Sequence, residues 1–361
     1  MKNENKYMLR ALELAKRGVG KVSPNPAVGA IIVKNNKIIG EGFHNYYGGK
    51  HAEVEAIENA TESVENSTMF VTLEPCNHYG QTPPCTERII KEKIKKVIVA
   101  MEDPNPKMSG RSIKIFQENG IEVKKGILES DTRKINQPYI KATKLKLPYI
   151  ILKSALSLDG FIADNNGNSK WISNAKSRKL VHKWRADYDA IMVGIGTVMK
   201  DDPMLTVREV SGENPTRIVY DPSISLIENL QIVKTANKIK TIVITNNKLS
   251  KEYKEMCKIN NIEILEMEKN TGKGWQRVLK ILTQKNIQSI MVEGGGKLQS
   301  QLLKDVLVDR IDLFYSTKVF GSGVSMMKFK INKVENSNIF KETKWEIIED
   351  NILFSGILKE Y

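Results

Sequence analysis

The sequence predicts an α/β protein built from two domains. Strand-like apolar runs alternate with helical segments along most of the chain, which is typical of a sheet covered by helices. The 361 residues, 40% of them hydrophobic, are enough to bury two cores. We therefore expect two α/β domains in sequence.

In the first half, the spacing of Met8, Leu12 and Ala15 predicts a helix over 7–17. The glycines that follow it are expected to end this helix. The elements expected after it are strands at 28–33, 38–43, 69–73 and 97–100 and helices at 52–60 and 86–93.

The second half predicts the same alternation. The expected strands are 149–156, 190–193, 217–220, 241–245, one near 262, and 290–292, and the expected helices are 251–260, 275–285 and 297–303.

A cluster of metal-ligating residues lies in the first half, between His51 and Cys85. One imidazole and two thiolates, from His51, Cys76 and Cys85, are suitable zinc ligands and leave a fourth position for water. Zinc would lower the pKa of that water toward about 7, and Glu53 would carry its proton to a leaving amine. H-x-E followed by P-C-x-x-C is the signature of zinc nucleobase deaminases, and the chain has His51-Ala52-Glu53 and Pro75-Cys76.

Two other interpretations of this cluster remain open. Cys85 lies nine positions after Cys76 instead of the three of the general signature, so the two cysteines could form a disulfide. A closed structural zinc site that includes His78 is the second alternative, although it would leave Glu53 without a role.

Polar residues on proline-braced loops are expected beside this cluster. Asn25 lies between two prolines before a strand and could hold a pyrimidine edge, or could cap its own turn. Asp103 and Asn105 lie on a similar loop at the same sheet edge, and an isolated His44 is by itself more typical of a structural residue.

Composition excludes several classes of protein. Three cysteines do not make a disulfide scaffold, and no segment approaches the roughly 20 apolar residues of a membrane span. We expect a cytoplasmic protein that does not bind membranes. The net charge of +14 comes from dispersed lysines, which indicates a solvated surface or a small anionic substrate more than nucleic acid.

Two strand-to-helix junctions in the second half are rich in glycine. Gly194 and Gly196 precede Thr197, and Gly294–Gly296 precede the helix expected at 297–303. Such junctions allow a phosphate to approach backbone N–H groups. Neither junction completes G-x-G-x-x-G, so nucleotide binding and a plain turn are equally open on pattern alone.

The motifs HAEVEA, TLEPCNHYGQTPPC, SPNPAVG and DPNP resemble the bifunctional riboflavin-biosynthesis deaminase/reductase family. The resemblance continues through a linker around 141–148 into SALSLDGFIAD, VGIGTVMKDDPMLTVR and VEGGGKLQSQLL. It implies a cytidine-deaminase-like α/β/α sandwich over 1–145 and a dihydrofolate-reductase-like α/β domain over 146–361.

In the first domain the resemblance assigns His51, Cys76 and Cys85 to zinc and Glu53 to proton transfer. The residues that would face substrate are Asn25, His44, His78, Asp103 and Asn105. Gln81 stands where many relatives carry a basic residue, and Lys50 and Lys107 are candidates to hold the substrate phosphate instead.

In the second domain the resemblance implies NADPH. The cofactor residues would be Ala155, Trp171, Thr197, Asp201, Gly295, Gly296, Lys297, Leu298, Gln299, Ser300 and Gln301, and the substrate residues Lys153, Ser169, Arg185, Leu205, Arg208 and Glu293. Arg185 and Arg208 could clamp a phosphate, and Glu293 could hold an aminopyrimidine. A surface salt bridge for Arg185 and core packing for Trp171 stay open.

The implied function is zinc-dependent deamination of a ribosylated diaminopyrimidine phosphate, followed by NADPH-dependent reduction of its ribosyl group. We expect phosphorylated pyrimidine substrates, no nucleic-acid partner and a homo-oligomer. A tRNA or nucleoside base deaminase with a fused nucleotide-binding domain, and a non-catalytic zinc-stabilised interaction protein, are the rival classes.

Overall fold

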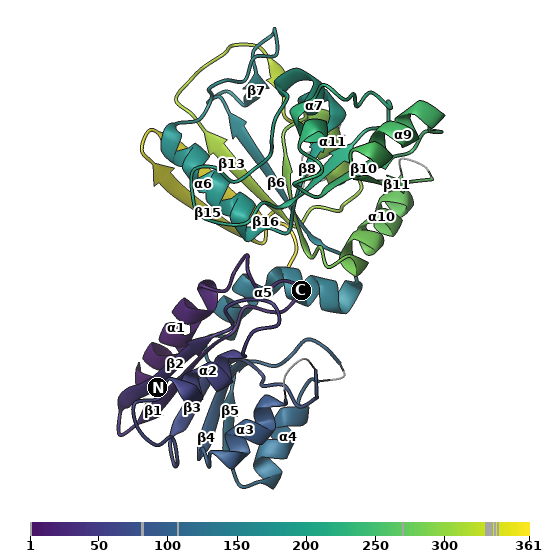
Figure 1. The fold of residues 1–361 in the computed structure, drawn as a ribbon. Coiled ribbons are helices and arrows are strands. Elements are labelled where there is room, and N and C mark those ends of the chain that lie inside the picture. Colours follow the sequence, from purple (N-terminus) through teal and green to yellow (C-terminus); the bar gives the residue numbers. More distant parts are fainter. Residues whose placement is uncertain are drawn as a thin grey trace. The chain divides into compact units, whose positions relative to one another are not determined.

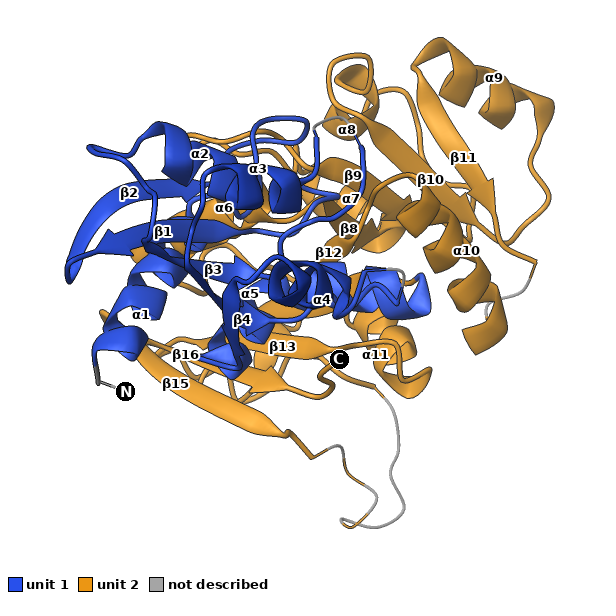
Figure 2. Cartoon of the chain, turned by 90° about the horizontal axis from the view of Figure 1, so that it is seen from below, with its two compact units in different colours: residues 1–146 blue, residues 147–361 orange. Residues whose placement is uncertain are grey.

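The chain is described by a computed structural model that covers residues 2–80, 83–106, 108–268, 271–328, 335, 337 and 339–361. It divides into two compact units, Met1–Lys146 and Leu147–Tyr361 (Figure 2). The boundary expected from the sequence, between residues 145 and 146, differs from this division by one residue. No helix in the described ranges is long and apolar enough to cross a membrane.

Unit 1 is built around a five-stranded sheet of order β2-β1-β3-β4-β5 (Figure 1). β1 pairs antiparallel with β2 and β3, whereas β3, β4 and β5 are parallel. Its elements are α1 (Lys2–Lys16), β1 (Gly29–Lys34), β2 (Lys37–Phe43), α2 (Ala52–Glu58), β3 (Thr68–Leu73), α3 (Cys85–Lys91), β4 (Lys96–Met101), α4 (Arg111–Glu118), β5 (Glu122–Lys125) and α5 (Glu129–Leu145).

Helices cover both faces of this sheet because its central strands are apolar on both sides. Ile32 and Val71 pack toward α2, α3 and α4, while Ile31 and Phe70 pack toward α1. Gly42 allows α2 to approach β2, since a Cβ there would lie 2.4 Å from the Ala52 carbonyl oxygen. This close packing fixes the start of α2 at the sheet edge.

Unit 2 is built around a nine-stranded sheet of order β11-β10-β9-β8-β12-β6-β13-β16-β15. The strands are parallel from β11 to β13, and β16 and β15 add antiparallel strands. The elements are β6 (Tyr149–Leu156), β7 (Phe161–Ala163), α6 (Ala175–Asp187), β8 (Ala190–Gly194), α7 (Ile195–Asp201), β9 (Thr216–Tyr220), α8 (Gln231–Lys234), β10 (Thr241–Thr245), α9 (Lys251–Ile259), β11 (Ile262–Glu266), α10 (Gly272–Gln284), β12 (Ser289–Glu293), α11 (Gly296–Lys304), β13 (Arg310–Tyr315), β14 (Val324–Ser325), β15 (Glu342–Ile348) and β16 (Asn351–Ile357).

The unit 2 sheet has a core on each face. Trp275 and Leu302, from α10 and α11, pack on one face, and Val181, Ile232 and Tyr253 pack on the other. Because the central strands are parallel, one edge of the sheet holds the carboxyl ends of β6, β12, β8, β9 and β10. Ligands bind at this edge in open α/β sheets.

The α/β class predicted from the sequence is confirmed. One expectation is wrong: the linker around 141–148 is helical up to Leu145, because α5 runs from Glu129 to that residue and buries Ile140 and Ala142. No element was predicted after residue 303, although β13, β16 and β15 complete the large sheet.

Candidate active sites

Three candidate metal ligands converge in unit 1. His51 directly precedes α2, Cys76 follows β3, and Cys85 is the first residue of α3. Their ligand atoms all lie within 4.8 Å of one another, and His51 Nδ1 is 3.2 Å from Cys85 Sγ and 3.4 Å from Cys76 Sγ. One imidazole and two thiols at these separations fit a zinc ion.

The charges of these groups also favour a cation. The hydrogen bond from the Cys85 thiol, with a further one from His51, lowers the pKa of Cys76 to about 4. A hydrogen bond with Cys76 raises the pKa of His51 to about 9. The hydrogen bond between Cys85 and Cys76, together with burial, raises the pKa of Cys85. Cys76 thus ionises readily beside a histidine and a second cysteine, as a zinc ligand must.

Both alternative interpretations of the cluster fail in the structure. Cys76 and Cys85 are free cysteines, so the disulfide interpretation is wrong. His78 is not part of the ligand cluster within the described part of unit 1, so no closed site of two histidines and two cysteines forms there.

Glu53 lies in the first turn of α2, two positions after His51, and is 4% exposed. Burial raises its pKa to about 7. Glu53 and Cys76 both line a cavity of about 330 Å³. A carboxyl group is thus placed beside the candidate metal and open to a ligand.

All five residues expected to face substrate in the first domain line this cavity: Asn25, His44, His78, Asp103 and Asn105. Asn25 Nδ2 lies 3.1 Å from His44 Nε2, and the other ring nitrogen lies 2.9 Å from the Lys50 carbonyl oxygen. Asn25 therefore contacts the second strand's end instead of only capping its own turn.

Two residues that sequence reasoning missed support the cavity. Tyr139 of α5 donates to Asp103 Oδ1 at 3.2 Å, and the buried Glu74 accepts from the Asp103 backbone N–H at 3.2 Å. Glu74 directly precedes the Pro75-Cys76 motif, and this position could have indicated its role. Tyr139 could not be found in the same way, because helix α5 was not expected. Lys50 pairs with Glu58 on the surface, and Gln81 and Lys107 lie outside the described residues.

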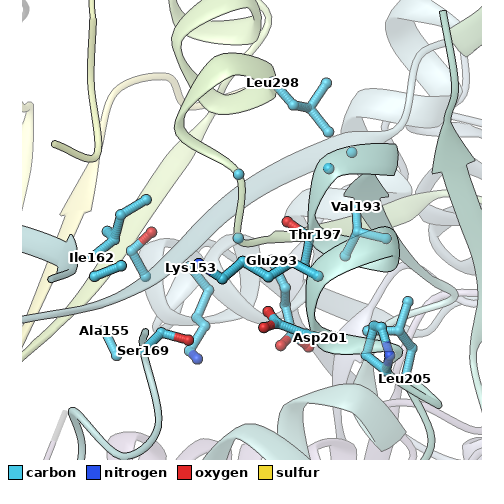
Figure 3. Close-up of a pocket in the computed structure, with 18 of the residues that line it drawn as sticks. Lys153, Ala155, Ile162, Ser169, Val193, Thr197, Asp201, Leu205, Glu293 and Leu298 are labelled. Atoms are coloured by element: carbon cyan, nitrogen blue, oxygen red, sulfur yellow. The ribbon is translucent and has the colours of Figure 1, made fainter. Parts of the chain in front are cut away.

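In unit 2 a cavity of about 990 Å³ opens at the carboxyl ends of the parallel strands (Figure 3). It is lined by fifteen of the seventeen residues expected to bind cofactor or substrate: Lys153, Ala155, Ser169, Trp171, Arg185, Thr197, Asp201, Leu205, Arg208, Glu293, Gly295, Gly296, Lys297, Leu298 and Gln301. Residues from both expected glycine-rich junctions thus meet in one space.

Gln299 and Ser300 do not line the cavity, in contrast to the expectation. Gln299 is fully buried and accepts from Ser154 Oγ at 3.0 Å, and Ser300 accepts from the Lys328 backbone N–H at 2.8 Å. Lys297, Leu298 and Gln301 occupy the cavity face of α11, and the helical period turns the two intervening residues away from it.

A buried ion pair lies at the base of the cavity. Arg185 Nε and Nη2 donate to the two Glu293 oxygens at 2.6 and 2.8 Å, and Nη1 donates to the Thr206 carbonyl at 3.2 Å. Burial alone would raise the pKa of Glu293, but the Arg185 guanidinium lowers it to about 2. The surface salt bridge considered for Arg185 is therefore wrong, and its guanidinium is already engaged by a carboxylate.

Lys153, Thr197 and Glu293 all line this cavity (Figure 3). Burial lowers the pKa of Lys153, against the attraction of Glu293. Gly294 and Gly295 have φ of +67° and +78°, and a Cβ on Gly295 would lie 3.2 Å from Thr197 Oγ1. The glycines therefore keep the backbone open toward α7, as a bound phosphate chain requires.

Trp171 is not a core residue. It is 61% exposed and lies with its ring 4.5 Å from the Arg178 guanidinium. The cavity is also lined by His182 and Asn246, which no sequence motif indicated. The side-chain oxygen Oδ1 of Asn246 is buried without a hydrogen-bond partner among the described residues.

Comparison with known families matches both units. Residues 148–353 match the family described as RibD C-terminal domain, and residues 1–101 match the cytidine and deoxycytidylate deaminase zinc-binding region. The riboflavin biosynthesis protein RibD of Aquifex aeolicus is 41% identical over 353 residues, which cover 97% of this chain and 98% of the relative. The chain belongs to the RibD family.

Other RibD proteins agree with this assignment. RibD of Escherichia coli is 36% identical over 329 residues and covers 88% of each chain. The crystal structure of a deaminase/reductase from Thermotoga maritima matches with a TM-score of 0.89 and 38% identity over 99% of both chains. RibD of Acinetobacter baumannii, form 1, matches with a TM-score of 0.89 and 34% identity, again over 99% of both chains.

RibD membership confirms the fold predicted for both halves, a deaminase-like α/β/α sandwich followed by a reductase-like α/β domain. The chain is a bifunctional enzyme of riboflavin biosynthesis, a hydrolytic deaminase and a reductase. Its cofactors are zinc and NADPH.

Proposed function

We propose that the enzyme deaminates 2,5-diamino-6-(5-phosphoribosylamino)pyrimidin-4(3H)-one in unit 1 and reduces 5-amino-6-(5-phosphoribosylamino)uracil in unit 2. The Thermotoga maritima relative is described as a deaminase and reductase that acts on these compounds. The observation that carries the proposal is the group of His51, Cys76 and Cys85 beside the buried Glu53 and a cavity of about 330 Å³. The functional domains would be 1–145 and 146–361.

In unit 1, His51, Cys76 and Cys85 would hold zinc, and Asn25 with His44 would orient the pyrimidine. Zinc, when bound, lowers the pKa of water so that a nucleophile forms at neutral pH. Glu53 takes the proton of the water that attacks C2 and delivers it to the departing amine. Ammonia leaves, and C2 keeps the oxygen as the carbonyl of the uracil. Asp103, Asn105 and His78 would contact the rest of the substrate.

In unit 2, the ring-opened ribosylamine would bind as an imine near Lys153 and Glu293. NADPH supplies the hydride, which adds to C1′ while a proton goes to the imine nitrogen. Lys153 is a half-buried group that lines the cavity and whose pKa burial lowers, and we assign it as the proton donor. Glu293 is held ionised by Arg185 and can accept hydrogen bonds from the amino-pyrimidine.

The phosphate contact in unit 2 is assigned to Arg208 instead of a two-arginine clamp. Arg208 is exposed and lines the cavity, while Arg185 already donates to both Glu293 oxygens. Ser169 and Leu205 would complete the substrate side. The residues that would contact NADPH are Ala155, Trp171, Thr197, Asp201, Gly295, Gly296, Lys297, Leu298 and Gln301.

We further propose a homo-oligomer located in the cytoplasm, with no nucleic-acid partner. Exposed apolar side chains at the end of the large sheet, Trp345, Ile347 and Ile352, are 62%, 83% and 41% exposed and support a contact between copies. Light scattering of the purified protein measures the mass directly, and a monomer would contradict this part of the proposal.

The proposed deaminase chemistry is tested by metal analysis and ammonia release. His51→Ala and Cys76→Ala are expected to lose zinc and ammonia release together, while NADPH oxidation with the aminouracil phosphate continues. Cys257→Ala, which removes the buried cysteine of α9, is the matched control and should keep the metal. Variants that lose zinc yet still release ammonia at the rate of the native enzyme would contradict the proposal.

A further inference from the structure

His182 is a buried imidazole in the wall of the unit 2 cavity that the proposed chemistry does not use. It is 6% exposed and lies on α6, three residues before Arg185. Residues three positions apart lie on the same helix face, so the side chains of His182 and Arg185 both line the unit 2 cavity. The imidazole therefore lies close to the residues assigned to the substrate, although it has no assigned role itself.

Its contact is with the segment that carries Arg208. The Arg208 backbone N–H donates to His182 Nδ1 at 3.3 Å, and His182 Nε2 lies 3.9 Å from Glu209 Oε1. A ring nitrogen that accepts an amide hydrogen bond carries no proton, so the ring is neutral with its proton on Nε2. The Arg208 guanidinium extends further and donates from Nη1 to Thr206 Oγ1 at 2.9 Å.

The charged groups around the ring keep it neutral. Arg185 lies on the same helix, Arg208 and Glu209 on the neighbouring loop, and Glu293 at the end of β12. Burial lowers the pKa of His182, the two arginines lower it further, and the two carboxylates oppose them. At neutral pH the ring is thus available as a hydrogen-bond acceptor.

We propose that neutral His182 is a positioning residue: it anchors the Arg208 segment to α6, so that the Arg208 guanidinium meets the substrate phosphate. This role rests on the proposed function of unit 2 and goes beyond it. Protonation of His182 would remove the acceptor for the Arg208 backbone N–H, and repulsion between the imidazolium and the two arginines would displace the Arg208 segment from α6. Binding of the phosphorylated substrate therefore weakens in acid, and turnover of bound substrate does not.

The test compares three substitutions at this position. In His182→Asn the amide oxygen places a hydrogen-bond acceptor near the position of Nδ1. In His182→Gln the acceptor lies near the position of Nε2, and His182→Ala has no acceptor. We expect His182→Ala and His182→Gln to raise KM for the aminouracil phosphate about tenfold, with kcat and KM for NADPH unchanged. His182→Asn should restore KM. Lys183→Ala, at the exposed next position, is the matched control.

Two further readouts separate positioning from a general structural role. With the dephosphorylated aminouracil substrate, His182→Ala and the native enzyme should have the same KM. In acid, KM of the native enzyme should rise more than KM of His182→Asn. The substrate phosphate, with its own pKa of about 6, titrates in every variant, so this difference is the diagnostic quantity.

Equal KM values for the native enzyme, His182→Ala and His182→Gln would overturn the role of His182, as would equal acid dependence in the native enzyme and His182→Asn. Should His182→Ala fail to fold, the comparison of Asn with Gln carries the test. A native enzyme that never oxidises NADPH with the aminouracil phosphate would instead contradict the proposed function.

Discussion

At the residue scale, Glu53 is the side chain on which the deaminase half depends. Glu53→Gln keeps the size of the side chain but cannot accept a proton, so ammonia release should fall by about 10²–10⁴-fold. NADPH oxidation with the aminouracil phosphate should stay unchanged, because it belongs to the other unit. Parallel ammonia and NADPH assays measure both, and undiminished ammonia release would show that Glu53 moves no proton.

The buried pair of Arg185 and Glu293 makes the stability of unit 2 sensitive to acid. The ordinary carboxyl pKa of 4.5 falls to about 2 in the fold, so the stabilisation is complete above 4.5 and is lost as the pH falls toward 2. Glu293→Gln should lower the free energy of unfolding by about 3 kcal/mol at neutral pH, and this difference should shrink in acid.

Urea unfolding at a series of pH values measures this effect. Glu349→Gln, which breaks the exposed pair with Lys176, is the control and should cost less than about 1 kcal/mol. A constant difference between the native protein and Glu293→Gln from neutral pH to acid would show that the ion pair does not stabilise the fold.

Sequence reasoning found the residues of this pair but not their contact. Arg185 lies on α6 and Glu293 ends β12, 108 positions apart, and no local pattern predicts that one would bind the other. The metal ligands were predictable because H-x-E and P-C are short motifs with a fixed chemical meaning. The position of Cys85, after a longer loop, was predictable from the resemblance to the family.

At the element scale, α5 explains why the proline-braced loop of unit 1 is held in place. Asn136 of α5 accepts from the Ala27 backbone N–H at 2.9 Å and donates to the Ala27 carbonyl at 3.0 Å. The segment 141–148 was expected to be a linker between the two halves, but it is helical up to Leu145. Helix formation there depends on packing against β3 and β4, which composition does not reveal.

Asn136→Ala should leave two buried backbone groups unpaired and destabilise unit 1 by about 2 kcal/mol. Because Ala27 follows the Asn25 loop, KM of the deaminase should rise with little change in the reductase. Thermal unfolding and the ammonia assay check both effects. Asn119→Ala, at the exposed end of α4, is the control, and equal behaviour of the two variants would contradict this role of α5.

The end of β10 gives a second test at this scale. Three strand spacings of about 4.8 Å separate β12 from β10, so the cavity can hold an extended dinucleotide from Glu293 to Asn246. The buried Asn246 Oδ1 needs a donor, which the adenosine half of NADPH can provide. Asn246→Ala should raise KM for NADPH severalfold at constant kcat, and an unchanged KM would place the cofactor elsewhere.

At the scale of the whole molecule, the two chemistries are carried by separate compact units, each with its own cavity. The general α/β class follows from alternating apolar segments, but the full order of the large sheet does not. β13 and β16 complete that sheet from residues far along the chain, and pairing between distant strands leaves no signature in either strand alone.

The most direct test of the account supplies the purified zinc-loaded protein with the diaminopyrimidine phosphate and NADPH. Ammonia release should precede NADPH oxidation, and the two should reach equal amounts. A zinc chelator should abolish both from this substrate, yet leave NADPH oxidation intact when the aminouracil phosphate is supplied instead. NADPH oxidation from the diaminopyrimidine phosphate without ammonia release, or deamination that continues after the metal is removed, would contradict the account.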